Sequence, residues 1–165
     1  MIPMPVRIDR NGANECYAYA IAMIYRSLGQ EDAEGSKISR KIRKLNNGKE
    51  DIKAEEIQAF INRDKKYRAT LYTGYLDDLK TCLTQGVPVM ILGRMSVEDP
   101  SYHYMTVTGY DQSHIYIADS YLFEEENEYY NRAVSYEEFS FMWDLEIDGY
   151  NHLFLQIEKK SSKKK

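Results

Sequence analysis

Cysteine and histidine are scarce in this chain, which has two cysteines and three histidines among its 165 residues. Two cysteines cannot form the disulfide framework of a small secreted domain, and they do not supply the ligands of a four-coordinate structural zinc site. A bridge between Cys16 and Cys82 would also consume both thiols. We therefore predict a fold that is stabilised by its hydrophobic core, with no metal site and no cofactor.

Long apolar runs are absent too. No run approaches the about 18 apolar residues that a membrane-spanning helix needs. The N-terminal stretch MIPMPVRIDR lacks the apolar region of a signal peptide. We expect neither a membrane span nor a signal peptide. Because unpaired thiols favour a reducing compartment, the sequence favours the cytoplasm as the location.

The chain also lacks an excess of positive charge, since its net charge is −4 and its pI is about 5.5. This balance argues against a nucleic-acid partner. We interpret the basic run SKISRKIRKL at 36–45 as the solvated face of a helix, and KKSSKKK at 159–165 as a disordered basic tail. The length fits one domain, for which we predict the bounds 1–158.

What the chain does have is a cysteine at the start of a very apolar helix, in NGANECYAYAIAMIYRSLG at 11–29. The residues after Cys16 are apolar around most of the helical circumference, which predicts a helix that runs through the core. Asn14 is the expected N-cap, and Gly29 is the expected left-handed C-terminal stop. Cys16 then lies in the first turn, where backbone N–H groups and the helix dipole favour a thiolate over a thiol.

The remaining periodicity places helices mainly in the first half of the chain and strands mainly in the second. Helices are predicted at 37–45, 51–63, 75–85 and 135–143, and strands at 4–9, 68–73, 88–92, 102–110, 114–120 and 152–157. This order predicts the α+β class, with the cysteine helix packed on a strongly curved antiparallel sheet.

The strands at 102–110 and 114–120 read as a hairpin. A turn centred on Asp111 pairs Val107 with Ile115, Met105 with Ile117, and His103 with Asp119, all on one face. A slip by one residue would move the isoleucines to the opposite face, so burial of this face specifies the register. The sequence therefore predicts a His103–Asp119 pair at the open end of the hairpin.

A carboxylate beside an imidazole fixes its tautomer and stabilises the imidazolium, and an imidazolium beside a helix-start cysteine stabilises the thiolate. Together these groups are the machinery of nucleophilic acyl transfer. The residues also permit a simpler interpretation, in which Cys16 is a small buried packing residue and the His103–Asp119 pair is only structural.

Three blocks of sequence carry a resemblance to a known family: Cys16 before an alanine-rich helix that ends in Leu-Gly, then LTQGVPVMIL, then YHYMTVTGYDQSHIYIADSY. Over residues 7–121 the chain resembles papain-like cysteine peptidases of the bacteriocin-leader-processing (double-glycine) type. The resemblance implies a papain-like fold and a peptide or protein substrate. It also implies that Cys16 is the nucleophile, His103 the general base and then acid, and Asp119 the orienting residue.

The chain departs from this family pattern at three positions. Tyr17 stands where members have glycine after the cysteine, Arg10 stands where they have glutamine, and Ser120 stands where they have proline. The nucleophile's backbone N–H would be one oxyanion donor. With the glutamine missing, we expect the second donor to be the Asn11 amide, with the Arg10 guanidinium as the alternative.

These residues are compatible with three functions. The leading hypothesis is a cysteine peptidase that cleaves a peptide bond through a thioester acyl-enzyme. A transglutaminase-like acyltransferase would use the same Cys-His-Asp set but pass the acyl group to an amine. The third is a degenerate papain-like domain that binds a peptide without cutting it, which the departures at Arg10 and Tyr17 would favour.

Overall fold

The computed structural model describes residues 15–49, 52–121 and 130–160. Its elements, in chain order, are α1 (Cys16–Ser27), α2 (Gly35–Leu45), α3 (Ala54–Arg63), β1 (Tyr67–Thr73), α4 (Leu76–Leu83), β2 (Val89–Arg94), β3 (Tyr102–Tyr110), β4 (His114–Ala118), β5 (Arg132–Ser135), α5 (Tyr136–Trp143), β6 (Glu146–Ile147), β7 (Tyr150–Asn151) and β8 (Leu153–Lys159). This confirms the predicted α+β class. Within the described ranges, no helix combines the length and apolar character needed to cross a bilayer.

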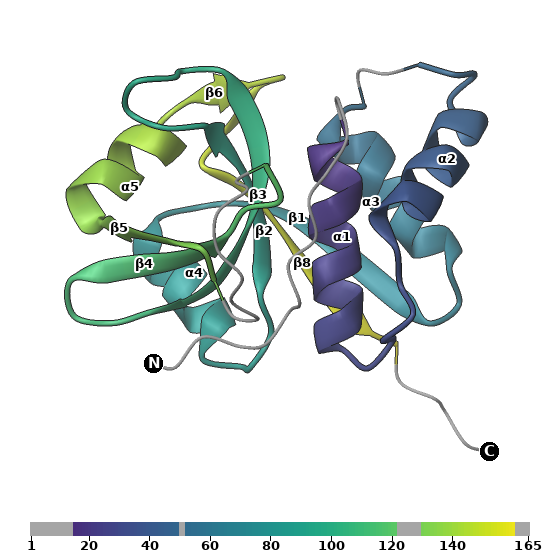
Figure 1. Ribbon diagram of the computed structural model, residues 1–165, viewed down its shortest axis with the longest axis horizontal. Coiled ribbons are helices and arrows are strands. Elements are labelled where there is room, and N and C mark those ends of the chain that lie inside the picture. The colour runs from purple at the N-terminus through teal and green to yellow at the C-terminus, as the bar shows by residue number, and fades with distance from the viewer. Residues whose placement is uncertain (1–14, 50–51, 122–129, 161–165) are drawn as a thin grey trace.

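A six-stranded sheet in the order β1-β8-β2-β3-β4-β5 forms the centre of the fold, and every pairing in it is antiparallel. Helices α1, α2 and α3 lie together on one side, and α4 and α5 lie on the other (Figure 1). Strand β2 is buried on both faces: Met90 and Leu92 belong to the cluster beneath α1, while Val89 and Ile91 belong to the cluster beneath α4 and α5. The continuous apolar run PVMIL is explained by this position.

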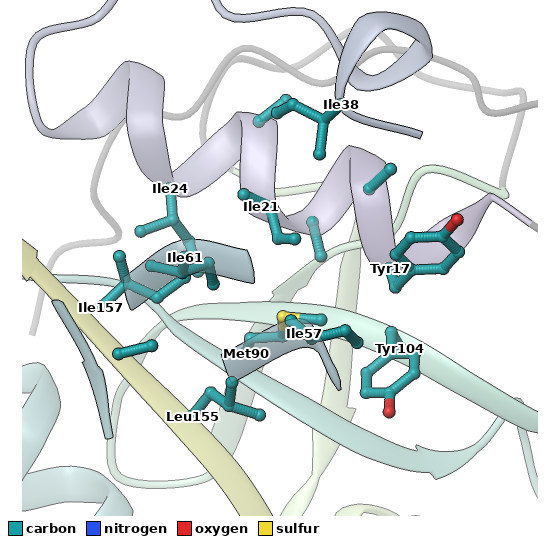
Figure 2. Packing of buried hydrophobic residues seen from close by; sticks show 14 of the residues in the cluster. Tyr17, Ile21, Ile24, Ile38, Ile57, Ile61, Met90, Tyr104, Leu155 and Ile157 are labelled. Atoms are coloured by element: carbon teal, nitrogen blue, oxygen red, sulfur yellow. The ribbon is translucent and has the colours of Figure 1, made fainter. Parts of the chain in front are cut away.

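Helix α1 crosses the core as predicted, because nine of its twelve residues are buried. Figure 2 shows its isoleucines Ile21 and Ile24 packed among side chains of α3, β2 and β8. Tyr17 belongs to the same cluster and is 3% exposed. Tyr17, which follows the cysteine, is therefore an inward-facing core residue.

The two ends of α1 match the prediction differently. At the C-terminal end, Gly29 has φ +109°, and the N–H groups of Gly29 and Gln30 bond to the carbonyls of Arg26 and Tyr25 in a Schellman motif. At the N-terminal end, the capping position is Glu15, whose side chain makes no capping hydrogen bond. The prediction of Asn14 as the N-cap was therefore wrong, and Asn14 itself lies outside the described residues.

The hairpin of β3 and β4 has a different register from the predicted one. Val107 pairs with Ile117 and Thr106 with Ala118, and a bulge follows Val107. The predicted pairing of Val107 with Ile115 was wrong because the turn is wider: the carboxylate of Asp111 accepts the N–H groups of Ser113 and His114. Up to the bulge the error is two residues, an even number, so Met105, Val107 and Ile117 stay on one side of the sheet as predicted.

Several short elements differ from the prediction or were not predicted. Strand β5 and the β6–β7 pair were missed, because four and two residues are too short to show a period. The predicted strand at 4–9 lies outside the described residues. The predicted helix at 135–143 is present as α5, and it is capped by Ser135, whose hydroxyl accepts the N–H of Glu138 at 3.1 Å.

Candidate active site

Cys16 is the first residue of α1, and its side chain is half-buried. The first residues of any helix have backbone N–H groups without an intrahelical acceptor, so the thiol lies at the positive end of the helix dipole. The backbone N–H of Tyr104 also donates to Cys16 Sγ, at 3.5 Å. The Cys16 sulfur therefore lies beside a backbone donor at the start of a helix.

His103 is the second residue of β3, and it is 3% exposed. Its Nε2 lies 2.6 Å from Asp119 Oδ1, and the N–H of the next residue, Tyr104, donates to Cys16 Sγ, which puts the thiol beside the start of β3. Burial would lower the pKa of His103, but the hydrogen bonds and charges of Asp119 and Cys16 outweigh it and raise the pKa from 6.5 to about 9. The imidazolium is therefore the favoured form of His103 at neutral pH.

Asp119 follows the end of β4 and is completely buried. Extrapolated by one residue, the β3–β4 register puts Met105 opposite Asp119, so Asp119 reaches His103 as a diagonal neighbour and not as its direct partner. Burial would raise the pKa of Asp119, but the hydrogen bond and charge of His103, the N–H of Tyr121 and the charge of Arg132 lower it. The carboxylate stays ionised despite its burial.

Two residues around Asp119 were not predicted from the sequence. Arg132 Nη1 lies 3.0 Å from Asp119 Oδ2, and the Asn131 side chain bonds to both the N–H and the carbonyl of Asp119. Arg132 pairs with Ile117 across β4 and β5, which puts an arginine beside a fully buried isoleucine. A strand assignment for 132–135 would have revealed this charge facing the core.

The structure separates the predicted site residues into two groups. Cys16, His103 and Asp119 come together at the N-terminal end of α1. Arg10 and Asn11, the candidate oxyanion donors, lie outside the described residues. Away from the site, Cys82 packs against the cluster beneath α4 and α5, and His114 lies at the hairpin turn, beside Ser113.

The arrangement is a thiol linked through an imidazole to a buried carboxylate, which is suited to nucleophilic attack on a carbonyl carbon. The ring of Tyr121 meets the His103 ring edge-on, with centroids 5.9 Å apart, and shields it on one side. In the described part of the chain, no group of three or more His, Cys, Asp or Glu side chains is arranged to hold a metal ion.

A family model described as Peptidase_C39 like family matches residues 2–145. The fold is similar to that of a double glycine motif protease from an AMS/PCAT transporter, solved in complex with the leader peptide, with a TM-score of 0.67 and 17% identity over 96% of this chain and 94% of that one. It is also similar to a Bacillus anthracis protein described as a C39-like peptidase, with a TM-score of 0.69 and 15% identity over 98% and 100% of the two chains. Comparison with curated proteins gives no match. These findings confirm the predicted fold and the resemblance to double-glycine peptidases.

Proposed function

Because the chain belongs to the Peptidase_C39 like family, and family and fold support a cysteine peptidase in general, we propose that Cys16 is its nucleophile, His103 its general base and acid, and Asp119 its orienting residue. The observation that carries this proposal is the position of His103, which bonds to Asp119 while the N–H of the next residue, Tyr104, donates to Cys16 Sγ. The purely structural interpretation of the pair does not account for this link to the thiol.

In the proposed reaction, the Cys16 thiolate attacks the carbonyl carbon of the scissile peptide bond, and an S–C bond forms as the carbonyl oxygen takes the negative charge. The C–N bond then breaks, and the His103 imidazolium gives its proton to the leaving amine. The product is a thioester between Cys16 and the acyl half of the substrate. Neutral His103 next takes a proton from water, the hydroxide attacks the thioester, and Cys16 is released with the acid product.

The proposed substrate is a peptide. One similar structure was solved with a leader peptide bound, although its identity with this chain is only 17%. That likeness supports an extended peptide as the substrate class and leaves its sequence open. The site holds its catalytic groups at one end of α1, with Cys16 half-buried, which suits access from the surface by an extended chain.

Four variants test this assignment. Cys16→Ala and His103→Ala should each remove turnover of a peptide library almost completely, because members of a triad act as a unit. Asp119→Asn should leave a larger residual rate, and His114→Ala, the matched control on the same hairpin, should leave turnover unchanged. Loss of activity in His114→Ala, or retention in His103→Ala, would refute the proposed roles.

The oxyanion donors are proposed as the backbone N–H of Cys16 and the side-chain amide of Asn11. Removal of one such donor costs about 10²- to 10³-fold in kcat with little change in KM, so Asn11→Ala should show a loss of that size. A loss of less than about threefold would contradict the assignment. If Arg10→Ala then gave the large drop, the guanidinium would be the donor in place of the family's glutamine.

Labelling separates this proposal from the two alternatives. An electrophilic peptide probe should modify Cys16, which mass spectrometry of the digested protein would locate. With a cleavable peptide and an added amine, release of acid product alone indicates hydrolysis, whereas an amide product indicates the transglutaminase-like acyltransferase. Tight peptide binding without either product would indicate the degenerate binding domain.

A further inference from the structure

Asp119 makes two charged contacts, and only one of them belongs to the proposed triad. Its Oδ1 lies 2.6 Å from His103 Nε2, and its Oδ2 lies 3.0 Å from Arg132 Nη1. The Asp119 side chain is completely buried, and the Arg132 side chain is 11% exposed. The carboxylate is thus held between His103, whose charge changes during the proposed reaction, and Arg132, whose charge does not.

The surroundings of Arg132 strengthen its hold on Asp119. Its two guanidinium nitrogens Nη1 and Nη2 lie 3.6 Å from the sulfur of Met105 and 3.8 Å from that of Met142, respectively. Thioethers are weak acceptors and do not compete with a carboxylate for the guanidinium. Because little water reaches this ion pair, it is screened less than a pair on the surface.

A buried carboxylate needs a positive partner at every stage of the reaction. While His103 is an imidazolium, Asp119 has two such partners. Once His103 has passed its proton to the leaving amine, the imidazole is neutral and Arg132 is the cation still in contact with Asp119. Without Arg132, that stage would leave a negative charge buried beside neutral groups, and His103 would keep its proton.

We propose that Arg132 is a positioning residue, which keeps Asp119 ionised and in place while His103 releases its proton. This inference rests on the proposed function, because it concerns the proton transfers of that reaction. Among the described residues, other ionisable side chains that bear on His103 are Cys16 on α1, Asp99 in the loop before β3, and Tyr121, whose ring meets the His103 ring edge-on. All three are present in the Arg132 variants.

The test reads the protonation of His103 directly, by NMR of the folded chain with labelled histidine, so it needs no turnover. In the native chain His103 should be about half protonated near pH 9. In Arg132→Met the midpoint should rise by about one pH unit, so that about nine-tenths of His103 is protonated at pH 9. Arg132→Lys, which retains the charge, should give the native value.

Two controls test whether Arg132 changes the His103 titration through Asp119. Arg68 forms an exposed pair with Glu158 on the far edge of the sheet, so Arg68→Met removes an arginine without touching the site. It should leave the His103 titration unchanged. In an Asp119→Asn background, Arg132→Met should no longer move the His103 midpoint, because the carboxylate that links the two cations is gone.

Each other outcome overturns the proposal. An unchanged midpoint in Arg132→Met would mean that the guanidinium is not coupled to His103. A midpoint that falls toward 6.5 would mean that the variant only opens the site to water. A rise of equal size in Arg132→Lys would show that charge is not the cause. Should Arg132→Met fail to fold, Arg132→Gln gives the same reading with a polar head group.

Measurements of peptide turnover then test the role of Arg132 and the proposed function separately. If the triad assignment holds, Arg132→Met should lower kcat by up to about tenfold with KM unchanged, since one pH unit in the basicity of His103 corresponds to that factor at most. A native chain that shows the predicted His103 titrations but no turnover would contradict the proposed function and leave the role of Arg132 standing.

Discussion

The raised pKa of His103 makes the stability of the fold depend on pH in a defined direction. A group whose folded pKa lies above its unfolded value stabilises the fold fully below the unfolded pKa, and this contribution is lost as the pH rises through the folded pKa. For His103 the two values are 6.5 and about 9. At about 1.4 kcal/mol per pH unit, the difference amounts to about 3 kcal/mol of unfolding free energy.

The measurement is urea unfolding of the native chain and of His103→Gln at several pH values from 6 to 10. The native chain should lose about 3 kcal/mol relative to the variant across this range, most of it between pH 6.5 and 9. Taking the difference between the two chains removes the contributions of tyrosines, lysines and Cys82, which titrate in both. His114→Gln is the matched control, because its ring lies at the exposed hairpin turn.

The variant Cys16→Ala separates the contribution of Cys16 to this pH dependence from that of Asp119. In Cys16→Ala the contribution of Cys16 to the raised pKa of His103 is lost, whereas the contact with Asp119 at 2.6 Å remains. The pH dependence should therefore shrink without disappearing. If the native chain and His103→Gln lost stability in parallel across the whole range, His103 would not be held as an imidazolium, and the proposed ion pair would be refuted.

The other expectations concern the thiols and the packing of α5. Iodoacetamide should alkylate Cys16 faster than Cys82 at pH 7, because burial and the charge of Asp78 raise the pKa of Cys82, and equal rates measured by mass spectrometry would contradict an activated Cys16. Gly93→Ala should lower the unfolding free energy by about 1 to 3 kcal/mol, since an added Cβ would lie 2.8 Å from the carbonyl oxygen of Met142; an unchanged thermal midpoint would show that α5 can move away from β2.

The candidate triad was predictable because it depends on which face of the strand each residue occupies more than on the exact pairing of the two strands. Residues that alternate along a strand share a face, so Met105, Val107 and Ile117 identify the buried face whether the hairpin pairs as predicted or slips by two residues. His103 and Asp119 share that face in both registers. A diagonal neighbour is still within reach of an imidazole and a carboxylate, which is why the wrong turn did not separate them.

The partners of Asp119 were not predictable by the same reasoning. Arg132 belongs to a strand of four residues, and its place beside β4 follows from a chain reversal between the two strands that leaves no periodic signal. The Tyr104 N–H, which donates to Cys16 Sγ, was also not predicted. Nearly every residue has a backbone donor, so a sequence does not show which of them faces the sulfur.

The position of Cys16 relative to His103 depends on the residue that follows each of them in the sequence. On α1, Cys16 faces the site and the next residue, Tyr17, is buried in the core. On β3, His103 contacts Asp119 and the next residue, Tyr104, joins the same core cluster as Tyr17. Figure 2 shows both tyrosines in this cluster, beneath the start of α1. The start of α1 and the start of β3 therefore share one core cluster, one residue away from Cys16 and His103, so Tyr17 contributes to the geometry of the site through the core.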